Sequence, residues 1–251
     1  MDIAWLILLV IGAFAGGFIN GLAGFGTSLF ALPWWLLVLP PVQAVALVLA
    51  MSVASGIQGM MAIWHDINWR HLAIFLVPAF CGIPFGLAIL HTIDAQSLSL
   101  LVALLLLSYG SFFSFKRELP NFTKPTPIID GMIGFVSGVL GAVAGLSGAL
   151  PTMWLGLRDW SKRQSRAILQ PFNMTILGLS ALLLLWRGAF TADVGWAMLV
   201  VLPVSIAAAK LGLMAFERMQ DRTFRRFLII AMLLSGIILL ARLALTMELF
   251  K

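Results

Sequence analysis

The sequence predicts an all-α membrane protein with several spans, because it is strongly apolar and carries long uncharged stretches. Hydrophobic residues make up 61% of the 251 residues and charged residues 10%, whereas soluble domains have about 25% charged residues. No charged side chain occurs between Ile3 and Trp64. A helical span needs about 20 apolar residues, so the chain has room for several spans and little for a soluble domain.

An internal duplication divides the chain into two repeats. The stretch G-G-F-I-N-G-L-A-G-F-G-T-S-L-F-A-L-P at 16–33 returns as I-G-F-V-S-G-V-L-G-A-V-A-G-L-S-G-A-L-P at 133–151. Each copy has a Gly-Phe step, a small polar residue before the next Gly, a glycine-rich break and a final Ala-Leu-Pro. The sequence therefore predicts a first transmembrane repeat at 1–115, a cytoplasmic linker at 116–127 and a second repeat at 128–251.

Five apolar segments follow one another in the first half. The segment 3–22 ends at the glycine break, and 28–39 runs from that break to a pair of prolines. The segment 42–64 ends at a charged turn, 71–90 has a proline in its middle, and 98–115 ends at the basic linker. The first segment lacks a basic N-terminal flank and a cleavage site, so we do not expect a removed signal peptide.

The second half repeats this order. The segment 128–143 reaches the second glycine break, 147–157 leaves it, and 167–186, 194–216 and 224–247 follow. The fourth segment of each half holds a matched mid-helix proline, Pro78 and Pro203, which removes one backbone hydrogen bond and bends the helix.

The basic residues predict the orientation. If the loops around Asp66, Lys116, Arg158 and Arg218 are cytoplasmic, all but three of the 16 Lys and Arg residues lie inside, as the positive-inside rule expects. The exceptions are Arg187, Arg242 and Lys251. Both chain termini are then expected on the outer side of the membrane, opposite the cytoplasm.

This orientation makes the two repeats inverted. The segment 128–157 begins and ends on the cytoplasmic side, so it enters the membrane and returns, whereas the hairpin of the first half begins and ends outside. Each repeat is then a broken, re-entrant-like helical hairpin plus three transmembrane helices. In secondary transporters with this plan the substrate site lies near the midplane, where the broken helices of both halves meet.

The strongest candidates for substrate contact lie at the two breaks. Helices starting at Thr27-Ser28 and Ser147-Gly148 would have hydroxyl caps, free N–H groups and the positive end of the helix dipole. Two such ends facing each other form an anion site that needs no buried cation. Glycines there permit positive φ and a close ligand approach; the alternative is that they only pack helices.

Polar side chains in the third segment of each half form a second layer. Gln170 and Asn173 either line a substrate path or bridge helices, whereas helix packing is favoured for Ser52, Ser55 and Gln58. The candidate substrate-binding residues are Asn20, Gly24, Gly26, Thr27, Ser28, Ser137, Gly145, Ser147, Gly148, Gln170 and Asn173.

Signals of catalysis are absent from the sequence. Its carboxylates lie near span ends, its histidines lack metal-ligand spacing, and nucleotide-binding or catalytic-triad motifs are not found. One cysteine, Cys81, excludes an internal disulfide. We therefore expect no enzyme, cofactor, bound metal or nucleic-acid partner. The residues concerned are Asp66, Asp94, Asp130, Asp193, Glu217, His65, His71 and His91.

The repeated G-F-x-(N/S)-G, break and A-L-P, with V-P-A-F-C-G-I-P-F-G and L-P-V-S-I-A-A-A-K-L-G around the matched prolines, resembles the sulfite exporter TauE/SafE family of bacterial membrane permeases. The resemblance covers essentially the whole chain. It implies a secondary transporter for a small sulfur oxyanion or organosulfonate, of the sulfite, sulfonate or sulfoacetate class. It also implies the bacterial inner membrane, so that the two termini are expected on the periplasmic side.

The chain departs from the usual glycine runs of that family at Thr27-Ser28 and at G-L-S-G, where extra hydroxyls could select a different anion. Its expected partners are the small anion and the lipid bilayer, and a homo-oligomer is left open. The alternative function is a non-transport accessory or assembly subunit, in which the glycines serve helix packing only.

Overall fold

The structure is a computed structural model that describes residues 3–115, 126–158 and 160–249. All regular elements in these ranges are helical, and each apolar segment of the sequence corresponds to one helix. The first half contains α1 (Ile3–Ala23), α2 (Thr27–Trp35), α3 (Pro41–Ile63), the short 3₁₀ helix η1 (Trp64–Asp66), α4 (Trp69–Leu90) and α5 (Ala95–Phe115). The second half contains α6 (Pro127–Ala144), α7 (Ala149–Leu155), α8 (Lys162–Trp186), α9 (Ala192–Arg218) and α10 (Asp221–Leu249).

The protein is a multi-pass membrane protein. Within the described ranges, six helices are long and apolar enough to cross a membrane: α1, α3, α4, α6, α8 and α9. Large apolar side chains such as Val77, Phe85 and Leu199 are more than half exposed, as expected of a surface that faces lipid. The all-α membrane prediction is therefore confirmed.

Both glycine breaks fall where the sequence predicts them. Helix α1 ends at Ala23 and α2 begins at Thr27, while α6 ends at Ala144 and α7 begins at Ala149. Gly24, Gly26 and Gly145 have positive φ angles of 78°, 90° and 67°, a conformation that glycine adopts without steric penalty. The first arms, α1 and α6, have membrane-spanning length, whereas the second arms have only nine and seven residues.

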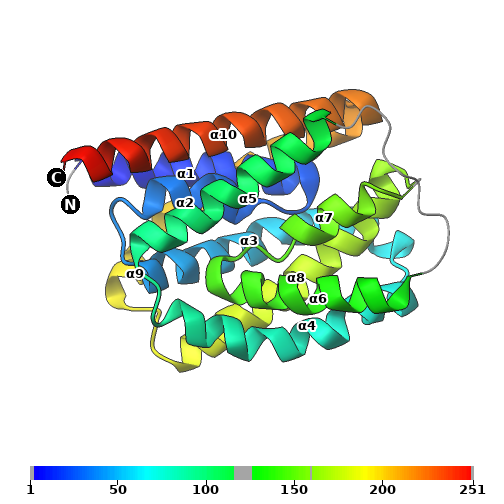
Figure 1. Cartoon of the computed structure of the whole chain (residues 1–251), viewed down its shortest axis with the longest axis horizontal. Helices are drawn as coiled ribbons and strands as arrows, with labels where there is room; N and C mark the ends of the chain where they lie inside the picture. Colours follow the sequence, from blue (N-terminus) through cyan, green and yellow to red (C-terminus); the bar gives the residue numbers. More distant parts are fainter. Residues whose placement is uncertain (1–2, 116–125, 159, 250–251) are drawn as a thin grey trace.

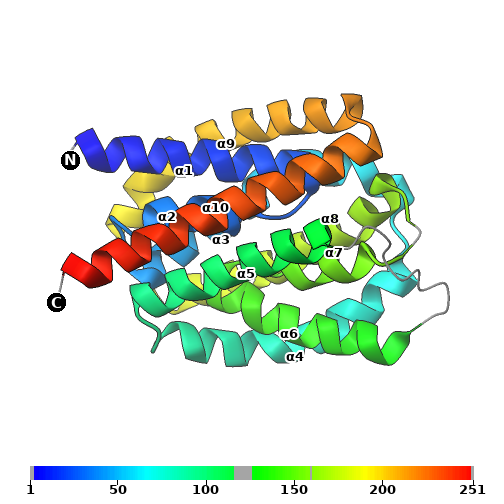
Figure 2. The same ribbon diagram turned by 45° about the horizontal axis from the view of Figure 1, so that its top comes forward.

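Helices of the first half pack against helices of the second half. Helix α1 runs along α9, α4 along α6, α3 along α8 and α5 along α10 (Figures 1 and 2). Small residues allow the first two pairs to approach closely: a Cβ on Gly21 would lie 2.0 Å from the Ala209 carbonyl oxygen, and one on Gly138 2.1 Å from that of Ala79. These two glycines therefore pack helices.

Several basic loops lie together at one end of the bundle, and the start of α1 and the end of α10 lie at the other end (Figures 1 and 2). Arg163 Nε is 2.7 Å from Asp66 Oδ2, which joins the start of α8 to η1. Lys162 Nζ donates a hydrogen bond of 2.8 Å to the Phe216 carbonyl, which joins α8 to α9. Most of the predicted linker, 116–125, lies outside the described residues.

Candidate functional site

The two breaks meet in the interior of the bundle. The Ser28 hydroxyl donates a 2.7 Å hydrogen bond to the carbonyl of Gly145, which ends α6. On the other side of the contact, a Cβ on Gly148 would lie 2.5 Å from Phe25 Cβ. Phe25 belongs to the first break and Gly148 to the second. The two breaks are therefore in direct contact at two points.

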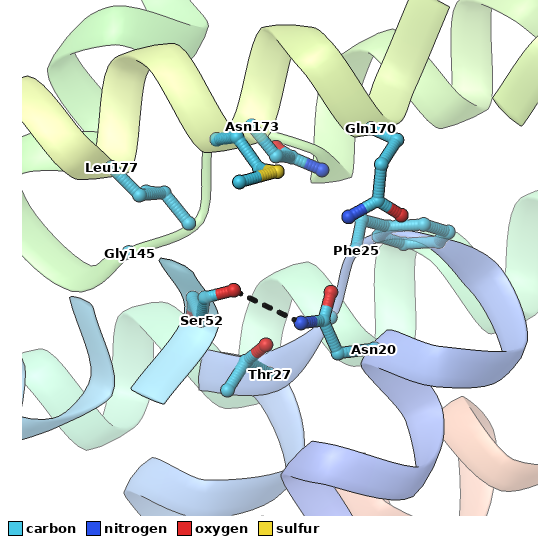
Figure 3. Close-up of a pocket in the computed structure, with 10 residues that line it drawn as sticks. Asn20, Phe25, Thr27, Ser52, Gly145, Gln170, Asn173 and Leu177 are labelled. Carbon is cyan, nitrogen blue, oxygen red and sulfur yellow. Dashed lines mark hydrogen bonds between the residues drawn. The ribbon is translucent and has the colours of Figure 1, made fainter. Parts of the chain in front are cut away.

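A small cavity lies at this meeting point (Figure 3). The space between its walls is about 260 Å³ when the part open to the surroundings is included, and the space left for a water-sized molecule is about 10 Å³, enough for about one water. Its walls come from α1, α2, α3, α8 and both breaks. The lining residues are Asn20, Phe25, Gly26, Thr27, Ser52, Gly145, Gln170, Asn173, Met174 and Leu177.

Asn173 connects the cavity to both breaks. Its Nδ2 donates to the Gly24 carbonyl at 2.9 Å, and its Oδ1 accepts from the Ser147 hydroxyl at 2.6 Å. Among the described residues only one acceptor is found for the two N–H groups of its amide, so the other N–H is left as a donor. Asn173 therefore both lines the cavity and bridges elements, which unites the two roles that the sequence left open.

Gln170 has the same double character. Its Nε2 donates to the Gly56 carbonyl of α3 at 3.1 Å, which leaves its second N–H free. Its Oε1 is buried and has no hydrogen-bond partner among the described residues. Figure 3 shows this amide beside Phe25, at the edge of the cavity.

Asn20 forms the opposite wall together with α3. Its Nδ2 donates to the Ser55 hydroxyl at 2.7 Å and to the Ser52 carbonyl at 3.2 Å, so both of its N–H groups are used. Ser52 and Ser55 also donate to carbonyls of their own helix. The packing role favoured for these two serines agrees with these bonds, although Ser52 also lines the cavity.

The predicted hydroxyl caps are wrong. The N-cap residues of α2 and α7 are Gly26 and Gly148, and in the described part of the chain neither helix start has a side-chain cap. Because a break with positive φ favours glycine immediately before α2, the hydroxyls of this motif fall inside the first turn or before the cap. Ser28 and Ser147 instead reach across to other elements.

The expected positive φ at Gly148 is also wrong. Gly148 has an ordinary φ of −85°, so its missing side chain is explained by contact with Phe25 and Asn173 and not by backbone conformation. Ser137, also predicted at the site, is fully buried in α6 and is not among the lining residues; its hydroxyl has no partner in the described ranges. Of the other predicted residues, Gly24, Ser28, Ser147 and Gly148 stand directly behind the cavity wall.

Sequence reasoning missed a buried cation beside the cavity. Arg166 was assigned to a basic loop, but it lies in α8, is 1% exposed, and donates to the carbonyls of Gly21 at 2.8 Å and Leu22 at 3.2 Å. Its guanidinium carbon is 4.4 Å from the centre of the Phe216 ring. The available signal was its position four residues before Gln170, on the same helical face.

Sequence reasoning also missed a buried ion pair at the basic end. Asp130, in the first turn of α6, is 1% exposed and lies 2.9 Å from Arg158 Nη2. The Trp154 indole donates to the same carboxylate at 2.6 Å, and His71 Nε2 is 3.6 Å away. Through Asp130, these contacts join the loop after α7 to the starts of α6 and α4. Among the described residues, no cluster of three or more His, Cys, Asp or Glu side chains could hold a metal ion.

A multi-pass helical bundle with a small polar cavity where two broken hairpins meet is typical of membrane transporters. The family model described as sulfite exporter TauE/SafE matches residues 8–239. The chain belongs to this family, whose members are transporters and not enzymes. The resemblance seen in the motifs is thus confirmed. No curated protein matched the chain.

Proposed function

We propose that this protein is a secondary permease that moves a small sulfur oxyanion or organosulfonate across the bacterial inner membrane. The observation that carries the proposal is the neutral, donor-rich cavity where the two breaks meet. Sulfite is the anion that the family description names, and we extend the substrate class to sulfonates and sulfoacetate because they carry the same kind of sulfur oxyanion.

The chemistry of the cavity suits an oxyanion. Asn173 and Gln170 each offer an unused amide N–H, and the Thr27 side chain lines the opposite wall, on the side of Asn20 and Ser52 (Figure 3). The start of α2 adds backbone N–H groups and the positive end of its dipole. None of the lining residues is acidic, so an entering anion meets no like charge, and each charge-assisted hydrogen bond contributes about 1.5 to 3 kcal/mol.

The contacts of the two hairpins support the inverted-repeat plan. Arg158 Nη2 donates to Thr126 Oγ1 at 2.6 Å, which joins the exit of the α6–α7 hairpin to its entrance at the basic end. Trp35 Nε1 donates to the Leu9 carbonyl at 3.2 Å, which brings the end of α2 back toward the start of α1. The hairpins therefore point in opposite directions in our proposal, with 1–115 and 128–251 as repeats and 116–127 as linker.

The pairing of helices across the halves supports alternating access. Because α1 packs on α9 and α4 packs on α6, one hairpin and the opposite repeat can move together as a body while the cavity stays at their junction. We place the basic end in the cytoplasm and both termini outside, following the charge bias.

The test is a flux assay in proteoliposomes with sulfite, a short alkanesulfonate and sulfoacetate. We expect saturable flux of at least one of them, absent from protein-free liposomes. Asn173→Asp should abolish it, because a carboxylate in the cavity repels the anion, whereas Asn173→Gln should keep part of it. A folded parent protein that neither transports nor is thermally stabilised by any of these anions would favour the accessory-subunit alternative.

A further inference from the structure

We propose that Arg166 forms a second anion-binding site, located between the cavity and the basic end of the bundle, which the substrate occupies during transport. This inference rests on the proposed function, because the ligand it assigns is the transported oxyanion. It differs from that function in adding a charged site outside the cavity.

The first argument is electrostatic. Arg166 is 1% exposed, and a buried charge is costly unless an opposite charge compensates it. Among the described side chains, none of the ion pairs includes Arg166, and Glu217 acts on it only at longer range. Its direct partners are two carbonyls and the Phe216 ring, and its Nε has no described partner. An oxyanion would supply the missing counter-charge.

The second argument is position. A Cβ on Gly59 would lie 2.7 Å from both Arg166 Nη2 and Gln170 Oε1, so these two side chains are neighbours. A Cβ on Gly24 would lie 2.7 Å from Gln170 Oε1 and 3.3 Å from Arg166 Cγ. Gln170 lines the cavity, and Gly24 belongs to the first break. An anion that leaves the cavity past Gln170 therefore meets the guanidinium next.

The third argument is continuity toward the basic end. Gln170, Arg166 and Lys162 follow one another at four-residue spacing on one face of α8, which we call the α8 strip; each step is about 6 Å along the helix. Phe216 lies beside two of them, with its ring centre 4.4 Å from the Arg166 guanidinium carbon and 4.7 Å from Lys162 Nζ. The α8 strip thus runs from a neutral donor at the cavity to cations at the end of the bundle.

When no anion is bound, Arg166 donates its hydrogen bonds to the carbonyls of Gly21 and Leu22. These carbonyls belong to the last turn of α1, and a cation there stabilises the negative end of the helix dipole. An oxyanion competes with them for the same N–H groups, because hydrogen bonds between ions are stronger than bonds to a neutral carbonyl. A purely structural Arg166 would keep these bonds whether or not an anion is present.

The experiment compares Arg166→Gln, Arg166→Lys and Arg163→Gln in proteoliposomes with sodium sulfite as the probe. We expect the KM for sulfite to rise tenfold or more in Arg166→Gln and to recover to within about threefold of the parent value in Arg166→Lys, which keeps the charge. Arg163→Gln removes the same charge from an exposed ion pair at the same end, so its KM should change less than twofold.

A second variant covers the case in which Arg166→Gln does not fold. Gly59→Ala places a methyl group against Arg166 and Gln170 without removing a charge, and it should raise the KM at least threefold. Gly178→Ala, also in a spanning helix, meets only an ordinary contact at 3.7 Å and is the matched control. A parent-like KM in folded Arg166→Gln, or in Gly59→Ala when the former does not fold, overturns the inference. Failure of the parent to transport any sulfur anion overturns the proposed function instead.

Discussion

The Ser28 hydroxyl donates a 2.7 Å hydrogen bond to the Gly145 carbonyl and so joins two broken hairpins that are 117 positions apart in the chain. Both residues are buried. The bond fixes the carbonyl at the end of α6, where the helix leaves it without an intrahelical partner. The geometry of the cavity therefore depends on a contact between the halves and not on either hairpin alone.

Removing this bond should weaken the junction. Ser28→Ala leaves the Gly145 carbonyl buried without its partner, which costs about 1 to 3 kcal/mol. We expect a lower melting temperature and slower transport. Ser99→Ala is the control, because that hydroxyl bonds only to the Ala95 carbonyl of its own helix. Equal melting temperatures for the two variants would show that the bond between the breaks contributes nothing to stability.

A side chain at Gly145 would meet both an unfavourable positive φ and a steric clash, whereas one at Gly188 would meet only the positive φ. Gly145 has φ of 67° and a Cβ there would lie 2.2 Å from Ser28 Oγ, whereas Gly188 has φ of 74° with nothing within 4 Å. Gly188→Ala should therefore cost only the left-handed strain of about 1 kcal/mol. Gly145→Ala should be clearly less stable, because the clash is added. The melting temperatures of both variants in detergent give the comparison. Equal decreases would mean that the Ser28 side chain adopts another rotamer and relieves the clash.

The buried ion pair should stabilise the basic end far more than the exposed one. The side chains of Asp130 and Arg158 are 1% and 5% exposed, against 35% and 65% for Asp66 and Arg163. Asp130→Asn leaves Arg158 buried without its counter-ion, a change that costs about 3 to 5 kcal/mol. Asp66→Asn should cost at most about 1 kcal/mol. The prediction is contradicted if the two variants unfold at the same temperature.

The sequence was sufficient for the order of helices and for the breaks, because these depend on local signals. Apolar length marks the spans, and the repeated glycines mark the ends of α1 and α6. The duplication identified Gly145, and the polar residues in an apolar helix identified Asn173; both line one cavity.

The remaining features depend on contacts that the sequence does not display. Arg166 is buried because α8 packs against the end of α1, more than 140 positions earlier, so a count of basic residues treats it as part of a loop. Ser147 bonds to Asn173 instead of capping a helix, since the break is closed by glycine. Asp130 lies at a span end as predicted, but packing of α4 and the loop after α7 buries it.

The orientation of the bundle in the membrane is open to direct measurement. Reporter fusions after Phe115 and after Arg163 should both indicate the cytoplasm, because the basic loops lie at one end of the bundle (Figure 1). A reporter at Asp94, in the turn between α4 and α5, should indicate the outside. Opposite sides for Phe115 and Arg163 would mean that the second hairpin is an ordinary span and would contradict the inverted-repeat plan.

The cavity itself predicts a graded series of affinities. Asn173→Ala removes a donor from the wall and should weaken sulfite binding about tenfold or more, since a charge-assisted hydrogen bond contributes about 1.5 to 3 kcal/mol. Thr27→Val removes a hydroxyl from a lining residue at nearly constant volume and should weaken binding to a similar degree. Ser147→Ala should have a smaller effect, because Ser147 reaches the site only through the Asn173 carbonyl oxygen.

Double substitution separates these roles. If Ser147 acts by orienting Asn173, then Ser147→Ala causes no further loss of sulfite affinity once Asn173 is alanine. The losses of affinity caused by Thr27→Val and Asn173→Ala should instead add in the double variant. Ser180→Ala is the matched control for Ser147→Ala. The Ser180 side chain, in α8, is as deeply buried as that of Ser147, but it does not line the cavity and its hydroxyl has no partner in the described residues. Binding of sulfite to purified, monodisperse variants is scored beside their melting temperatures. Unchanged affinity in both Asn173→Ala and Thr27→Val, with normal binding by the parent, would rule out the cavity as the anion site.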